Sequence, residues 1–263
     1  MSTLKKKLRI LVSNDDGIDA PGIYTLVGEL KKIGDVTVVA PDKQMSAVGH
    51  AITVNYPLRV TDFVKNGDFF GYAVEGTPAD CVKLAIRSLL SLPPDIVVSG
   101  INHGSNTGIN IIYSGTVSAA TEGTVLGIPS IAISLATWGE ANFAYAAKFA
   151  RRLTQFVSHE GLPEATLLNV NVPAVEEKEI KGVRVTRQGK TRWDDTFDVR
   201  RDPNNKEYFW LTGKLEIIDR SDETDEISVK KNYVSVTPIH YDLTDYGMLE
   251  KMKRWKLDGL PNR

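Results

Sequence analysis

Two adjacent carboxylates, Asp15 and Asp16, are the side chains of this sequence best placed to do chemistry. They follow a short apolar run, Ile10–Val12, which is typical of a strand buried on both faces of a parallel sheet. A helical pattern starts at Pro21, so the pair lies on a strand-to-helix turn. Open α/β sheets bind ligands at this edge, which suits two carboxylates to metal binding or acid–base catalysis. A plain turn explains them as well, because turns favour Asn, Asp and Gly.

Two further polar side chains, Ser46 and Asn102, follow later predicted strands. Ser46 lies in the loop after strand 36–40, and Asn102 lies in the loop after strand 95–99. Parallel strands end at the same edge of a sheet, so both are expected beside the acidic pair. Together with the two carboxylates they offer oxygen, the ligand type of a hard divalent cation such as Mg²⁺ or Mn²⁺. Considered alone, Ser46 is a solvated loop hydroxyl.

A candidate phosphate site lies further along the chain. Residues 113–116 precede a helix of small residues that begins near Val117. Hydroxyl groups and free backbone N–H groups at the start of a helix form an anion site suited to a phosphate. Ser114 and Thr116 are also ordinary helix-capping residues, and the two roles can coexist.

A glycine-rich segment, residues 100–108, comes before this helix and contains Asn102 and Asn106. Glycine allows a ligand to approach the backbone closely. The segment has neither the dinucleotide pattern Gly-x-Gly-x-x-Gly leading into a helix nor the Gly-Lys-Ser/Thr of a P-loop. The NAD-binding and NTP-binding interpretations therefore lose their main support.

The elements that position these residues alternate between strands and helices as far as about residue 175. The predicted strands are 10–12, 36–40, 52–60, 69–74, 95–99, 128–135 and 167–172, and the predicted helices are 21–30, 78–90, 117–123 and 142–159. This alternation predicts a doubly wound α/β domain with a mainly parallel sheet over residues 1–175.

The pattern changes after residue 175. Strands at 183–186 and 208–211 are predicted to flank a charged stretch, 192–206, with no helix between them. We interpret residues 176–235 as a β-rich excursion that serves an oligomer interface. Residues 236–263 continue a returning strand, 233–238, into a helical tail with Leu249, Met252 and Trp255 on one face, which needs a neighbouring subunit to bury it.

Composition narrows the function class. The chain has 263 residues, of which 42% are hydrophobic and 25% charged, as in ordinary globular proteins. A net charge of −1 gives no reason to expect nucleic acid or a membrane surface as a partner. No signal peptide or membrane-spanning run is present, so a cytoplasmic location is expected. Cys81 is the single cysteine, which excludes an internal disulfide, and its apolar helical surroundings predict a packed thiol.

Taken together, these segments resemble the SurE survival-protein nucleotidases. The resemblance covers nearly the whole chain and rests on the segments 13–17, 46–50, 75–80, 99–102, 113–117 and 237–238. It implies a Rossmann-like core and a phosphatase that hydrolyses nucleoside monophosphates with one divalent cation, Mg²⁺ or Mn²⁺, per subunit. It also implies a homodimer or homotetramer that exchanges C-terminal elements. Hydrolysis of 3′-nucleotides and of polyphosphate is left open.

The resemblance assigns roles to individual residues. The metal ligands of the family fall on Asp15, Asp16, Ser46 and Asn102, and its phosphate contacts fall on Asn106, Ser114, Gly115 and Thr116. Tyr246 departs from the pattern, because some members have a histidine in this part of the tail.

The expected mechanism is attack by a water molecule, with Asp15 or Asp16 as the general base. Direct attack by an aspartate remains the competing route. His50 and His103 are expected to be structural, so replacing either by Gln should leave most of the activity. Two other functions stay open: a nucleotide-binding module without turnover, and a structural scaffold that acts through the C-terminal excursion.

Overall fold

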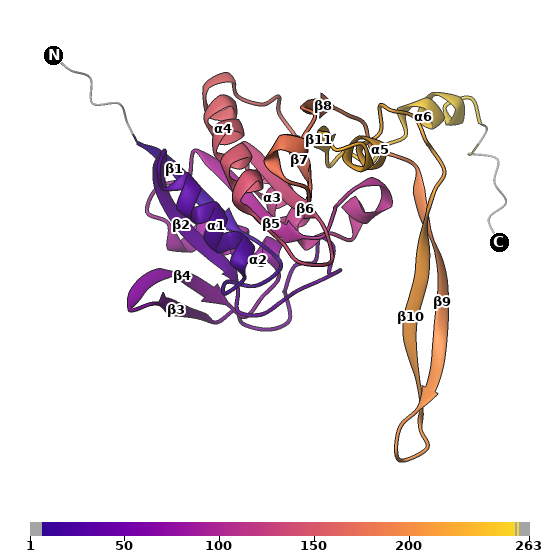
Figure 1. Ribbon diagram of the computed structural model, residues 1–263, viewed down its shortest axis with the longest axis horizontal. Coiled ribbons are helices and arrows are strands. Elements are labelled where there is room, and N and C mark those ends of the chain that lie inside the picture. The colour runs from indigo at the N-terminus through magenta and orange to yellow at the C-terminus, as the bar shows by residue number, and fades with distance from the viewer. Residues whose placement is uncertain (1–6, 256, 258–263) are drawn as a thin grey trace.

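The computed structural model describes residues 7–255 and 257, and a nine-stranded sheet forms its centre (Figure 1). The strands of this sheet are β1 (Leu8–Ser13), β2 (Gly34–Pro41), β3 (Val60–Lys65), β4 (Asp68–Val74), β5 (Ile96–His103), β6 (Ser130–Ala136), β7 (Thr166–Pro173), β8 (Val183–Val185) and β11 (Val234–His240). Their spatial order is β3-β4-β2-β1-β5-β6-β7-β11-β8. The strands from β4 to β7 run parallel, whereas β3 and β11 run antiparallel to β4 and β7. The prediction of an α/β fold with a mainly parallel sheet is confirmed.

Helices cover both faces of the sheet. The four principal ones are α1 (Pro21–Leu30), α2 (Pro78–Leu84), α3 (Gly115–Val125) and α4 (Ala144–Glu160), with one π-helical turn, Ala85–Leu89, directly after α2. Helices α1 and α4 share one apolar cluster with Ile10 and Val12, whereas α2 and α3 share another with Leu11. Successive residues of β1 thus pack into two separate cores, one on each face of the sheet, as expected for a strand buried on both faces. Cys81 lies in the second core, where burial raises the pKa of its thiol well above the usual range.

The chain reverses direction across the sheet between β1 and β5. From β1 it runs through β2 to β4 on one side, and it returns to β5 before continuing outward through β6 and β7. Strands β1 and β5 are direct neighbours, with Ser13 opposite Ser99. The crevice at the carboxyl ends of two such strands is where doubly wound folds bind ligands.

Beyond β8 the chain leaves the sheet as a long two-stranded ribbon (Figure 1). It consists of β9 (Thr191–Arg201) and β10 (Glu207–Ile217), paired antiparallel. The expectation that residues 192–206 form a charged stretch between two strands was wrong, because most of the stretch is β9 itself. As expected, no helix lies between the segments 183–186 and 208–211; α5 (Asp225–Lys230) comes later, after β10. Both faces of the ribbon are exposed, so charged residues occur on each of them. The alternation of apolar and polar residues that marks a strand is therefore hard to see in the sequence.

Smaller differences concern the rest of the chain. Residues 52–59 form no strand; the strand begins at Val60, and the turn at Asn66–Gly67 is confirmed by positive φ angles at both residues. The strand predicted at 183–186 is β8, which pairs with β11 in the main sheet rather than with the ribbon. The tail helix is confirmed as α6 (Tyr246–Met252).

The division into regions 1–175, 176–235 and 236–263 stays a prediction. Residues 1–6, 256 and 258–263, at the ends of the first and third regions, lie outside the described residues. No helix in the described part of the chain has the length and apolar character to cross a bilayer.

Candidate functional site

The turn after β1 separates a structural role from a chemical one. Asn14 closes the turn by donating from Nδ2 to the Gly17 carbonyl, 2.8 Å away, and Gly17 adopts a φ of +96°. A side-chain hydrogen bond to the backbone and a residue with a positive φ angle are the two features that a tight turn requires. The side chains of Asp15 and Asp16 take no part in them and contact α3 and β5 instead.

Asp15 lies against the first turn of α3. The Thr116 hydroxyl donates a hydrogen bond to its Oδ1 atom, and the side chain is buried. Burial raises the pKa of Asp15 to about 6, with the charge of Asp16 adding to the rise and the Thr116 hydrogen bond opposing it. Gly115 makes this approach possible, because a Cβ atom there would lie 2.6 Å from the Cβ of Asp15.

Asp16 faces the end of β5. Its Oδ2 atom accepts the backbone N–H of His103 at 3.0 Å, and burial raises its pKa. The His103 ring points elsewhere, to the Gly139 carbonyl at 2.8 Å. Asn102 was predicted to lie in a loop, but β5 continues through it, since pairing with β6 resumes at Asn102 after an irregularity.

The orientation of Asn102 leaves its side-chain oxygen available. The Nδ2 atom donates to the Gly104 carbonyl at 2.8 Å, and this bond fixes which side-chain atom is nitrogen and which is oxygen. The oxygen, Oδ1, takes no part in the bond and can accept from or bind another group. Neither Asp15 nor Asp16 forms an ion pair within the described residues. One buried and one half-buried carboxylate, without an ion-pair partner in the described residues, and the amide oxygen of Asn102, which directly precedes the residue whose N–H binds Asp16, form a donor set that fits a hard divalent cation.

Ser46 is the outlying member of the predicted set. It lies in residues 42–53, here named the Ser46 loop. The Ser46 side chain is exposed, and its Oγ atom accepts a hydrogen bond from Gln44 at 2.9 Å. The loop touches the site through the Met45 N–H, which donates to the Asp15 carbonyl at 2.7 Å. No hydrogen bond between the Ser46 side chain and the other three predicted ligands occurs in residues 7–255. Nor do three His, Cys, Asp or Glu side chains gather as a metal site there, so a cation has to use Ser and Asn oxygens as well.

The predicted phosphate contacts surround the start of α3. Ser114 is the N-cap, and its Oγ accepts the Val117 N–H at 3.1 Å. Asn106 lies before α3 and is buried; its backbone N–H donates to Asn171 at 2.7 Å, and its Nδ2 donates to Ser134 at 2.9 Å. These hydrogen bonds fix Ser114 and Asn106, and the other two predicted contacts, Gly115 and Thr116, lie against Asp15.

Several residues that support Asn106 escaped the sequence analysis. The side chains of Asn169 and Asn171 both donate to its carbonyl. Their signal was present, because polar residues alternate with apolar ones in the buried strand β7. Two carboxylates of α5 hold the next two residues of the chain: Glu226 accepts the Thr107 hydroxyl, and Asp225 accepts the Gly108 N–H at 2.9 Å. Their separation of more than a hundred residues from this segment leaves no local pattern to find.

Comparison with known proteins identifies the family. Residues 10–195 match the family model described as "Survival protein SurE". The chain belongs to the SurE family. It is 52% identical to the 5′-nucleotidase SurE of Chlorobium chlorochromatii, over 94% of this chain and 91% of that one. It is 51% identical to the 5′-nucleotidase SurE of Syntrophobacter fumaroxidans, over 95% and 100%.

A solved SurE structure shares the fold. The crystal structure of the SurE protein from Aquifex aeolicus superposes with a TM-score of 0.80 at 44% identity, covering 93% of this chain and 98% of that chain. The family resemblance drawn from the sequence motifs is thereby confirmed.

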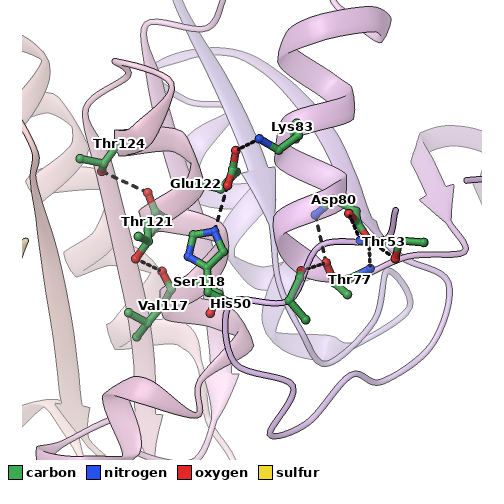
Figure 2. A network of polar contacts seen from close by, with 12 residues as sticks. His50, Thr53, Thr77, Asp80, Lys83, Val117, Ser118, Thr121, Glu122 and Thr124 are labelled. Carbon is green, nitrogen blue, oxygen red and sulfur yellow. Dashed lines mark hydrogen bonds and ion pairs between the residues drawn. The ribbon is translucent and has the colours of Figure 1, made fainter. Parts of the chain in front are cut away.

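This SurE chain has a further buried carboxylate, Glu122, later in α3. Figure 2 shows it between His50 and Lys83. His50 Nε2 lies 2.9 Å from one carboxylate oxygen, and Lys83 Nζ lies 2.6 Å from the other. Burial raises the pKa of Glu122, but the hydrogen bonds from His50 and Lys83 outweigh it and leave the pKa below the ordinary value of 4.5.

This pairing predicts a pH-dependent contribution to stability. Because the folded-state pKa of Glu122 lies below the unfolded one, its contribution is complete above about pH 4.5 and is lost as the pH falls through the folded value. We expect Glu122→Gln to lower the free energy of unfolding by about 2 kcal/mol at pH 7. Chemical denaturation of both proteins from pH 7 to pH 3 measures the difference, which should shrink at the acid end. A difference that grows on acidification would contradict the ion-pair assignment.

Proposed function

We propose that this chain is a 5′-nucleotidase that hydrolyses nucleoside 5′-monophosphates to nucleoside and phosphate with one divalent cation, Mg²⁺ or Mn²⁺, per subunit. The observation that carries the proposal is the buried carboxylate of Asp15 against the first turn of α3, with the half-buried carboxylate of Asp16 next to it at the end of β5. A cation and a phosphate are the two groups that such a pair of sites would accept. The relatives named 5′-nucleotidase SurE supply the substrate class.

Each residue has a role in this proposal. Asp15, Asp16, Asn102 and Ser46 hold the cation, which when bound supplies positive charge to the phosphoryl group and lowers the pKa of a bound water. One of the two aspartates takes the proton of the attacking water as the P–O bond to the nucleoside breaks, and the leaving oxygen of the nucleoside takes up a proton from that carboxyl group or from solvent. The N–H groups and hydroxyls at the start of α3, with Asn106, stabilise the charge on the phosphoryl oxygens. These contacts involve Asn106, Ser114, Gly115 and Thr116.

Phosphate release tests the proposal. The protein is stripped with EDTA and assayed with 5′- and 3′-nucleoside monophosphates and polyphosphate, with and without Mn²⁺ or Mg²⁺. Release from 5′-monophosphates that requires added metal is expected. Phosphate release without any added metal would contradict the proposal. Folded protein that releases phosphate from none of the substrates would also contradict it and would favour a nucleotide-binding module. Acid quenching during turnover separates the two nucleophiles, because only attack by aspartate leaves a phosphorylated protein.

The ribbon supports the further proposal of a homodimer or homotetramer. Its register places Phe197 opposite Leu211 and Val199 opposite Phe209, on one face of the two strands. These four side chains are between 54% and 63% exposed. A two-stranded ribbon is marginal in water by itself, so an apolar face of this kind calls for a second copy of the chain.

A charge on that face should therefore disrupt assembly. We expect Phe209→Asp to shift the protein to a smaller species in light scattering coupled to gel filtration. Thr212→Asp is the matched control, because Thr212 lies on the opposite face of the ribbon, paired with Thr196. The same mass for both variants as for the wild type would exclude this face as the interface.

A further inference from the structure

The position of Ser46 depends on two backbone hydrogen bonds, one on each side of it in the Ser46 loop. On one side, the Met45 N–H donates to the Asp15 carbonyl, 2.7 Å away. On the other, the Gly49 N–H donates to the carbonyl of Tyr113, 3.0 Å away and one residue before the N-cap of α3. Between these anchors the Ser46 side chain is exposed, and its one hydrogen bond within residues 7–255 is to Gln44, a residue of the same loop. The contacts near Gly49 therefore help to determine where Ser46 lies.

The residue directly after that anchor is tied to the interior. His50 reaches from the loop to Glu122, as Figure 2 shows, and the Glu122 side chain is only 3% exposed. Lys83 of α2 holds the other carboxylate oxygen at 2.6 Å. A buried carboxylate with both oxygens engaged is a stiff attachment point, since an unpaired one would be strongly destabilising. Glu122 lies in α3, the helix whose first turn carries the predicted phosphate contacts.

We propose that His50, held by the Glu122–Lys83 pair, is a positioning residue that sets Ser46 at the correct distance from Asp15 to serve as a cation ligand. The proposal rests on the metal site proposed above. His50 does not contact the site itself; it acts through the loop, because the loop and the first turn of α3 are joined at Gly49–Tyr113 and again at His50–Glu122.

Separate contacts keep the rest of the loop in place without His50. The Thr53 backbone N–H and hydroxyl donate to the Asp80 carboxylate at 2.9 and 2.6 Å, and the Thr77 hydroxyl donates to the Ala51 carbonyl at 2.7 Å (Figure 2). Loss of the His50 side chain should therefore leave residues 46–50 tied to the start of α3, within the described chain, only through the Gly49–Tyr113 hydrogen bond, so that they loosen while the fold stays intact. Local release of a ligand loop lowers metal affinity without lowering the melting temperature by more than a few degrees.

Binding of Mn²⁺ to metal-stripped protein, followed by electron paramagnetic resonance, tests this directly. We expect His50→Ala to raise the Kd for Mn²⁺ about tenfold, a usual effect of losing a group that orients a ligand. His50→Gln should restore most of the affinity, because the Gln amide can still donate to Glu122. His159→Ala is the control, since His159 is exposed and bonded only to the neighbouring Glu160 within the described chain.

A double-mutant cycle with Ser46→Ala decides whether the effect passes through Ser46. If it does, His50→Ala adds little to the loss that Ser46→Ala causes by itself. An equal tenfold loss in both backgrounds, an unchanged Kd in His50→Ala, or an unchanged Kd in Ser46→Ala would each overturn the proposal. Failure of the nucleotidase assignment is distinguishable: the cycle would hold for Mn²⁺ binding while no nucleotide released phosphate.

Discussion

Asp15→Asn is expected to lower metal-dependent phosphate release about a thousandfold or more. The substitution keeps the size of the side chain and an oxygen that can accept the Thr116 hydroxyl, but it removes the negative charge. Loss of that charge weakens the cation site and removes a candidate general base in one step. Losses of two to three orders of magnitude are common when a single preorganised electrostatic group of an active site is removed.

The same variant should not be less stable when metal is absent. The pKa of Asp15 is about 6 in the folded protein, against an ordinary value of 3.8, so its ionised form opposes folding at pH 7. The neutral amide removes this cost, and the melting temperature of the stripped variant should equal or exceed that of the stripped wild type.

Initial rates of phosphate release from AMP, with Mn²⁺ at saturation, measure the effect of Asp15→Asn. Asp35→Asn is the matched control, because Asp35 is an exposed residue paired with Lys7 at the surface. Retention of more than a tenth of the wild-type rate by Asp15→Asn would contradict its place at the centre of the site.

Gly115→Ala is expected to reduce kcat/KM about a hundredfold, although alanine is the better helix former. A Cβ atom at position 115 would lie 2.6 Å from the Cβ of Asp15, 2.9 Å from its Oδ2 and 3.1 Å from Pro78. Asp15 has to move to relieve this contact, and small displacements of a reacting group cost large factors in rate. The same methyl group would also stand among the N–H groups proposed to bind the phosphate.

Gly28→Ala separates this clash from helix propensity. Gly28 lies in α1, is exposed and has nothing within 4 Å of the position a Cβ would take. Alanine there should stabilise the protein by about 0.5–1 kcal/mol and leave the steady-state rates unchanged. Equal activity of the two variants would show that Asp15 is not held against Gly115 in the working enzyme.

The sheet and the acidic turn could be predicted because their signals are local. The apolar run at Ile10–Val12, the Pro21 helix start and the Thr77 cap each lie within a few residues of the structure that they specify. The rule that parallel strands end at the same edge then predicted Asn102 to lie beside the acidic pair, without any knowledge of side-chain contacts. Strands β1 and β5 are indeed neighbours, and the backbone N–H of His103, the residue after Asn102, donates to Asp16.

What escaped prediction depends on contacts that are distant in the chain. Nothing near His50 indicates that its partner is Glu122, 72 residues away, and nothing near Gly108 indicates Asp225. The ribbon was obscured for a different reason. Its apolar residues are spaced among charges that stay in water on both sides, so β9 resembles a solvated loop until its pairing with β10 is known.

The α5 carboxylates carry a consequence for synthesis of the protein. Thr107 and Gly108 obtain these partners only from residues 225 and 226, which leave the ribosome 117 and 119 residues later. A nascent chain can fold its first strands early, since domains fold from the N-terminus as they emerge. It cannot complete these two contacts until residue 226 has emerged. The edge of the sheet proposed as the catalytic site would thus be completed late, and truncated products of interrupted translation should be poor phosphatases even where their sheet has formed.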